Sequence, residues 1–189
     1  MVPLQSRTLR WSLGAGLVTA LAVSPFASEA MRDGTASPDS IAWKTVVGLV
    51  ERQWPSVPQM SSAELARRIA VGDTPLLIDT RTRDEYRVSH IPGAVWAESP
   101  VQLRTAIRDV PSDRLIVLYC SVGVRSSRAA AMLTRDGGFT IANLRGSIFQ
   151  WANEGRALER DGTVATLVHP YNRAWGLLLD PRRRATTAQ

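Results

Sequence analysis

The chain of 189 residues contains a single cysteine, Cys120, and only two histidines, His90 and His169. One thiol excludes an internal disulfide and a zinc site built from several thiolates. Two isolated histidines provide neither an HExxH motif nor a histidine cluster that would hold a metal. The sequence therefore predicts no metal site and no cofactor.

The chain also lacks an apolar run long enough to span a membrane as a helix. The apolar stretch at residues 11–23 is shorter than the ~20 residues that a spanning helix needs. Arg7 and Arg10 precede this stretch, and Ser28-Glu29-Ala30 offers small residues typical of a signal-peptidase site. We expect residues 1–30 to be a cleaved signal peptide and the protein to be periplasmic or secreted. The alternative is an uncleaved N-terminal anchor, and only then would the protein be attached to a membrane.

Positive charge is in excess but is not concentrated on one element. The formal net charge is +6 and the sequence pI is about 10.6, yet the basic residues are spread along the chain except for Arg182-Arg183-Arg184. No expected helix carries basic residues on one face interleaved with aromatics. We therefore expect a solvated basic surface that suits small anionic substrates, and no nucleic-acid partner.

Residues 31–57 are expected to form a linker followed by a short helix. Residues 31–40 are small and polar, as in a linker. Four apolar residues of the segment 41–52 recur at i, i+3, i+4 and i+7, which predicts one apolar helix face packed on the domain rather than on a membrane. These residues are Trp43, Val46, Val47 and Val50.

Residues 58–160 alternate short apolar runs with segments that favour helices. Strands are expected at 76–79, 94–97, 115–119 and 141–144, and helices at 61–71, 83–89, 101–108, 127–136 and 147–153. In the first of these helices, Leu65 and Ile69 are expected to face inward. Continuously apolar strands that alternate with helices predict an α/β fold, a small parallel sheet with helices on both faces.

Residues 161–189 are less regular and are expected to form a C-terminal extension. Trp175 and the run Leu177–Leu179 are apolar enough to dock back on the domain. We expect the remainder to be a flexible basic tail.

Cys120 lies where the clearest expected strand, 115–119, ends and a helix begins. Sites in such folds form at the ends of the strands. A helix N-terminus and inward-pointing loop amides lower the pKa of a thiol, and the thiolate is its reactive form. A lone cysteine at a strand end is otherwise a small buried hydrophobe, but the flanking loop favours a reactive sulfur.

Each residue of the loop after Cys120 has an expected role. Gly123 lets the chain curl tightly, and Arg125 supplies a fixed positive charge for an oxyanion. Ser126 is the expected N-cap of the helix, and Ser121 offers a hydroxyl. The remaining two residues, Val122 and Val124, are expected to make the rim of the site apolar.

No histidine adjoins Cys120 in the sequence. His90 lies in a Pro-Gly turn, where we expect it to satisfy local hydrogen bonds rather than to act as a general base. A cysteine–histidine pair of the papain type is therefore unsupported.

The order of three segments between residues 58 and 160 resembles the rhodanese family of sulfurtransferases. The three segments are Leu77-Ile78-Asp79-Thr80-Arg81 with Glu85-Tyr86; His90-Ile91-Pro92-Gly93-Ala94; and Tyr119 to Ser126 followed by Asn143-Leu144-Arg145-Gly146-Ser147 and Trp151. The resemblance implies a rhodanese-like fold and a sulfurtransferase in which Cys120 takes a sulfane sulfur from an anionic donor such as thiosulfate. The resulting persulfide would pass the sulfur to a thiol or to cyanide.

The resemblance also implies roles for individual residues. The loop amides would hold the persulfide, and Arg125 would orient the donor or brace the loop. Asp79 and Arg81 would be structural, with Arg81 tying neighbouring loops together. In many single-domain members a basic or polar residue directly follows the cysteine. Here that residue is Ser121, and Val122 and Val124 make the rim of the loop fairly apolar, so a persulfide, a polysulfide or a protein-bound sulfur is an alternative donor.

Two other functions stay open. The fold also supports phosphatases and arsenate reductases, but their cysteine-to-arginine loop is one residue longer than the C-x4-R spacing of Cys120 and Arg125. The shorter loop favours sulfur over phosphate. A non-enzymatic sulfur carrier is the second alternative, suggested by the apolar loop rim and the aromatic C-terminal segment.

Overall fold

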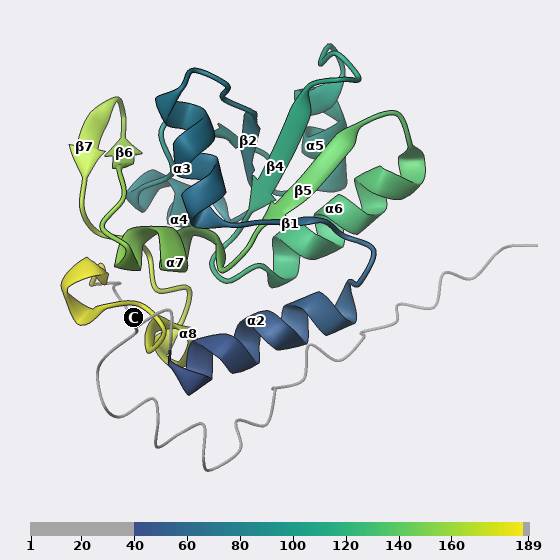
Figure 1. Ribbon diagram of the computed structural model, residues 1–189. Coiled ribbons are helices and arrows are strands. Elements are labelled where there is room, and N and C mark those ends of the chain that lie inside the picture. Colours follow the sequence, from purple (N-terminus) through teal and green to yellow (C-terminus); the bar gives the residue numbers. More distant parts are fainter. Residues whose placement is uncertain (1–39, 187–189) are drawn as a thin grey trace, which may run out of the picture.

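The computed structural model describes residues 40–186, and its centre is a five-stranded sheet in the order β1-β5-β4-β2-β3, parallel throughout (Figure 1). The strands are β1 (Gln59–Met60), β2 (Leu76–Asp79), β3 (Val95–Trp96), β4 (Leu115–Tyr119) and β5 (Thr140–Leu144). Two strands, β6 (Leu158–Arg160) and β7 (Thr163–Ala165), form a separate antiparallel pair. The α/β fold expected from the sequence is confirmed.

Helices cover both faces of the sheet. On one face lie α2 (Ile41–Gln53), α3 (Ser62–Ala70) and α7 (Ser147–Asn153), and on the other lie α5 (Pro100–Ile107) and α6 (Val124–Asp136). The short helices α4 (Arg83–Val88), α8 (Arg173–Gly176) and η1 (Pro181–Arg183) complete the described chain. Each face therefore has its own apolar core.

The central strand β4 shows why this sheet is buried on both sides. Val117 and Tyr119 belong to the core under α2, α3 and α7, whereas Ile116 and Leu118 belong to the core under α5 and α6. All four side chains are fully buried. Successive residues of a strand point to opposite faces, so a strand covered on both sides must be apolar at every position.

Helix α2 packs on the domain, as its apolar face predicts. Trp43, Val46, Val47 and Val50 are all buried, and the indole Nε1 of Trp43 donates a hydrogen bond to the Leu178 carbonyl at 3.2 Å. No helix within residues 40–186 is long and apolar enough to cross a membrane. The signal peptide expected at residues 1–30 and most of the linker lie outside the described residues, so they stay predictions.

Several expectations about local structure need correction. Ile69 is 36% exposed, because it lies in the last turn of α3 next to the exposed Val71, while Leu65 is buried as expected. The strands β1, β6 and β7 were not expected from the sequence. Each has only two or three residues, too few for an alternation of apolar and polar positions to be recognised.

The C-terminal extension docks on the domain through Leu178 and Leu179, both buried. Its last described residues are not a free tail. The Val168 amide donates to the Arg183 carbonyl at 2.7 Å, and the Ala185 amide donates to the Val168 carbonyl at 2.9 Å. These backbone bonds hold residues 183–185 beside residue 168, so the basic cluster is part of the fold.

Candidate active site around Cys120

Cys120 follows directly on β4, at the carboxyl end of the parallel sheet, and is buried. The Gly123 amide lies 3.2 Å from Cys120 Sγ and donates to it. Gly123 has φ 110°, and a Cβ there would lie 3.3 Å from Asn143 Nδ2 and 3.5 Å from Val50 Cγ1. Glycine is required here by both its left-handed backbone and the close approach of its neighbours.

Gly123, rather than Ser126, is the N-cap of α6, so the expected cap was wrong. The tight turn at Gly123 starts the helix at Val124, which places Ser126 inside its first turn. The buried Ser126 hydroxyl instead donates to Asn143 Oδ1 on β5 at 2.6 Å, and Asn143 Nδ2 donates to Gln59 Oε1 at 2.7 Å. Ser126 therefore anchors the start of α6 to the neighbouring strands.

Arg125 forms a bidentate ion pair with Glu85 of α4. Arg125 Nη1 donates to Glu85 Oε2 at 2.7 Å and Arg125 Nη2 donates to Glu85 Oε1 at 2.8 Å. The Ser121 hydroxyl completes the cluster, because it donates to Glu85 at 2.8 Å and accepts from Arg125 at 2.9 Å. Of the two roles expected for Arg125, the arrangement therefore favours bracing the loop. The Ser121 hydroxyl, which was expected to be available in the loop, is bonded to Glu85 and Arg125.

The electrostatics of this cluster favour the thiolate. Burial acts to raise the pKa of Cys120, but the positive charge of Arg125 and hydrogen bonds from Ser126 and the Gly123 amide outweigh it, so the pKa lies below its ordinary value. The Ser126 hydroxyl has one proton, already directed to Asn143, so the backbone amides and Arg125 are the lasting contributors. Burial also acts to raise the pKa of Glu85, but the Arg125 pair dominates and lowers it to about 2.

Neutralising Arg125 and neutralising Glu85 should move the pKa of Cys120 in opposite directions. Arg125→Gln removes the charge that stabilises the thiolate, so the pKa should rise. Glu85 is ionised at neutral pH, and Glu85→Gln removes a negative charge while leaving Arg125 positive, so the pKa should fall. The pH dependence of Cys120 alkylation by iodoacetamide measures both shifts.

Arg128→Gln is the matched control, because Arg128 lies on the same helix with an exposed side chain. It should leave the alkylation profile unchanged. Equal profiles for Arg125→Gln and the wild type would show that the loop amides alone set the thiol pKa.

The C-terminal extension reaches this cluster. The Arg125 guanidinium carbon lies 4.8 Å from the centre of the Tyr171 ring, a cation–π contact. Tyr171 has φ 64°, which is uncommon for a residue other than glycine, and its amide donates to His169 Nδ1 at 3.0 Å. Burial lowers the pKa of His169, and the charges of Glu85 and Arg125 also act on it. Glu85 thus binds the Nη atoms at the edge of the Arg125 guanidinium, and the Tyr171 ring covers one of its faces.

The expected apolar rim is only half correct. Val122 is buried in the core under α2 and α7, so it does not form a rim. Val124 is partly exposed and packs against the same core. The loop is buried from Cys120 to Val122, and Gly123 then starts α6 at Val124, where the chain becomes partly exposed.

The other candidate residues have structural partners. Asp79 and Arg81 are fully buried and form an ion pair of 2.7 Å, and Arg81 Nη2 donates to the Ser89 carbonyl at 2.6 Å, so Arg81 does tie neighbouring segments together. His90 contacts the Tyr86 carbonyl through Nδ1 at 3.1 Å and Glu159 through Nε2 at 3.3 Å. These contacts confirm the local role expected for His90.

Sequence reasoning assigned no role to two residues that support the loop. Glu85 is the partner of Arg125, and Ser147 Oγ accepts a hydrogen bond from the Cys120 amide at 3.2 Å. The Thr82–Glu85 spacing marks a capping box, which does form, but it gives no hint of an ion pair with a residue 40 positions away. Among residues 40–186, no group of three or more histidine, cysteine or acidic side chains could hold a metal ion.

Known proteins resemble this chain over the region that builds the site. The sequence model of the rhodanese-like domain matches residues 61–154. A sulfurtransferase of Allochromatium vinosum is 37% identical over 100 residues, which cover 52% of this chain and 92% of that protein. A probable adenylyltransferase/sulfurtransferase, MoeZ of Mycobacterium tuberculosis, is 37% identical over 79 residues, which cover 41% of this chain and only 20% of MoeZ.

Solved structures agree in fold. A thiosulfate sulfurtransferase from Pseudomonas aeruginosa superposes with a TM-score of 0.54 at 20% identity, covering 76% of this chain and 32% of that chain. The rhodanese-like domain of an Anabaena protein superposes with a TM-score of 0.50 at 24% identity, covering 56% of this chain and 83% of that domain. At these identities the likeness establishes the fold alone.

Proposed function

Because the chain belongs to the rhodanese-like domain family, we propose that it is a sulfurtransferase that carries sulfur as a persulfide on Cys120. The family membership and the sulfurtransferase relative support a transferase of this type. The observation that carries the persulfide step is the site of Cys120, where the Gly123 amide and the charge of Arg125 lower the pKa of a buried thiol.

The proposed first half-reaction forms the persulfide. The Cys120 thiolate attacks the outer sulfur of a donor such as thiosulfate, a bond forms between Sγ and that sulfur, and the bond from that sulfur to the sulfonate breaks. Sulfite leaves with the electron pair of the broken bond. The persulfide then lies in the loop, where amides that face a thiolate also suit its anionic outer sulfur.

The proposed second half-reaction returns the thiolate. An acceptor such as cyanide or a thiol attacks the outer sulfur, and Cys120 leaves with the electron pair of the sulfur–sulfur bond. Donor and acceptor thus react in turn with one nucleophile, which is a ping-pong scheme. Arg125 acts as a positioning residue, because both of its Nη atoms donate to Glu85 or Ser121 and the Tyr171 ring covers one face of its guanidinium.

Mass spectrometry of the Cys120 peptide tests the proposal. After incubation with thiosulfate or with inorganic polysulfide, the peptide should gain about 32 Da, the mass of one sulfur atom, and cyanide should remove this mass with release of thiocyanate. Failure to gain the mass with any sulfane donor would rule out the enzyme. Gain with polysulfide but not with thiosulfate would leave the sulfurtransferase in place and exclude thiosulfate as donor.

Turnover and phosphate-release assays separate the two alternative functions. A carrier without enzyme activity would hold the added sulfur through repeated exposure to cyanide or dithiothreitol, whereas fast multiple turnover argues against it. A phosphatase would release phosphate from an aryl phosphate. We expect no such release, because the C-x4-R loop is one residue shorter than the loop of the phosphatases. Small sulfur anions as donors, with thiols or cyanide as acceptors, are therefore the partners that we propose.

A further inference from the structure

The cluster beside Cys120 receives one contact from outside the rhodanese-like domain. The sequence match to that domain ends before the C-terminal extension, yet Tyr171 of the extension places its ring 4.8 Å from the Arg125 guanidinium carbon. In the described part of the chain, no other hydrogen bond, ion pair or ring contact joins residues 169–176 to Arg125 or Glu85. Tyr171 is therefore the link between the extension and the thiolate site.

The extension holds Tyr171 in a tight turn. The Tyr171 amide donates to His169 Nδ1 at 3.0 Å, and the Asn172 amide donates to the Pro170 carbonyl at 2.8 Å, which closes a three-residue turn. Asn172 is also the N-cap of α8, where its Oδ1 accepts from the Trp175 amide at 3.0 Å. The left-handed φ of 64° at Tyr171 is a conformation that persists only where such surrounding contacts enforce it.

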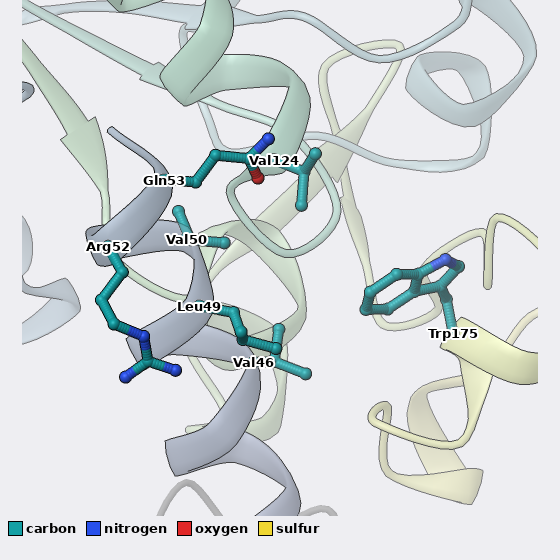
Figure 2. A pocket seen from close by; sticks show the side chains of 7 residues that line it. All are labelled: Val46, Leu49, Val50, Arg52, Gln53, Val124 and Trp175. Atoms are coloured by element: carbon teal, nitrogen blue, oxygen red, sulfur yellow. The ribbon is translucent and has the colours of Figure 1, made fainter. Parts of the chain in front are cut away.

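The extension is fixed to the domain on either side of this turn. The Ser89 hydroxyl donates to the Leu167 carbonyl at 2.6 Å, and Asn153 Nδ2 donates to the Leu178 carbonyl at 2.8 Å. Between these anchors, Trp175 lines an open cavity of about 360 Å³, and α2 lines its opposite side (Figure 2). The turn thus depends on its own hydrogen bonds and on the two anchors, because the cavity separates this part of the extension from α2.

The Tyr171 ring shields a charge that acts on Cys120. The Arg125 side chain is 31% exposed, and its positive charge favours the thiolate. Water on the face of the guanidinium would screen that charge, since the interaction between two charges weakens as the local dielectric rises. The ring takes the place of this water and attracts the cation. The contact therefore confines the guanidinium and strengthens its action on the sulfur.

We propose that Tyr171 is a positioning residue of the Cys120 site, which keeps the Arg125 guanidinium in the geometry that favours the thiolate, and that His169 keeps the Tyr171 ring in place. The proposal gives a role in the site to a segment beyond the rhodanese-like domain. It goes beyond the sulfurtransferase function, since it requires only that Cys120 ionises. Burial lowers the pKa of His169, so its imidazole is neutral at neutral pH and Nδ1 can accept the Tyr171 amide.

The pH dependence of Cys120 alkylation by iodoacetamide tests the proposal. Tyr171→Ala should raise the pKa of Cys120 by about 0.3 to 0.7 of a pH unit, the equivalent of one partly exposed cation–π contact. Tyr171→Phe retains the ring and should match the wild type, because the Tyr171 hydroxyl makes no hydrogen bond with any residue that the structure describes. The thermal midpoint of each variant shows that it is folded.

An Arg125→Gln background shows whether the ring acts through Arg125. In this background Tyr171→Ala should cause no further change in the pKa of Cys120, because the ring has no cation to position. A change of the same size in both backgrounds would mean that the ring acts on the sulfur directly, and the proposal would be wrong. The proposal would also be wrong if Tyr171→Ala left the pKa unchanged and only accelerated alkylation of the thiolate, as removal of a simple shield would.

Two substitutions of His169 test its part. Asparagine places Oδ1 close to the position of Nδ1 and readily accepts from the amide two residues ahead, so His169→Asn should match the wild type. His169→Ala removes the acceptor and should raise the pKa of Cys120, as Tyr171→Ala does. Equal profiles for the two variants would refute the role of His169. Leu177→Ala is the matched control, because Leu177 is exposed in the same extension, and it should leave the profile unchanged.

Alkylation needs no sulfur donor, so this proposal and the proposed function can fail separately. If the protein forms a persulfide but the pKa of Cys120 does not respond to Tyr171→Ala, the role of Tyr171 is refuted and the sulfurtransferase remains. If the pKa responds as expected but no sulfane donor loads Cys120, the sulfurtransferase is refuted and the positioning role remains.

Discussion

Cys120→Ser is expected to reduce sulfur transfer by at least about a thousandfold, the scale seen when a nucleophile is removed from an enzyme. A serine hydroxyl is a far weaker nucleophile at neutral pH, and its oxygen cannot form the persulfide bond. The measurement is thiocyanate release from each donor that loads the wild type. The variant peptide should also show no gain of sulfur mass.

The substitution changes one buried atom and should leave the fold intact. Far-ultraviolet circular dichroism and the thermal midpoint of the variant serve as the control. Turnover above about a hundredth of that of the wild type, in a variant that is folded, would place the sulfur on another group and refute the persulfide mechanism.

Asp79→Asn should lower the free energy of unfolding by about 3–5 kcal/mol, because it leaves a buried charge without its counter-ion. Asp79 and Arg81 are both fully buried, and three side-chain hydrogen bonds join them, two from Arg81 Nε and one from Nη2. Arg81 Nη1 has no hydrogen-bond partner, so the remaining charge would be poorly satisfied. Urea unfolding monitored by tryptophan fluorescence measures the change.

Two comparisons make this prediction specific. Asp84→Asn removes an exposed carboxylate 4.0 Å from Arg87, and its cost should stay below about 1 kcal/mol. The double variant Asp79→Leu/Arg81→Met should recover part of the loss, because neither charge is then buried. Recovery should be incomplete, since Arg81 also bonds the Ser89 carbonyl. A loss for Asp79→Asn no larger than that for Asp84→Asn would show that the pair is not strongly desolvated.

The fold was largely predictable because its signals are local. The run Leu115–Tyr119 is apolar at each position, which only a strand buried on both faces requires. Helix 147–153 was expected with the bounds that α7 has, and the face of α2 was correct. The two-residue strand β1 was missed because its residues are held by pairing with β5, a contact with residues far along the chain.

The candidate site was predictable only in part, for the same reason. The position of Cys120 after a strand and the glycine in its loop are local features, and the structure retains both. The N-cap was wrong because Gly123 adopts a left-handed turn and caps the helix itself, three residues before Ser126. Outside the loop, the residues that contact Arg125 are Glu85, which precedes the loop in the chain, and Tyr171, which follows it. No sequence pattern near either residue predicts these contacts.

The sequence by itself therefore determined a parallel α/β domain with one cysteine sulfur at a strand end, because strand burial, helix periodicity and loop spacing are properties of neighbouring residues. Only the tertiary structure decided what surrounds that sulfur. Arg125 has its charge paired with Glu85, and an open cavity lined by Val46, Val124 and Trp175 lies between α2 and the C-terminal extension. These contacts join residues far apart in the chain, and burial then sets their strength by excluding water.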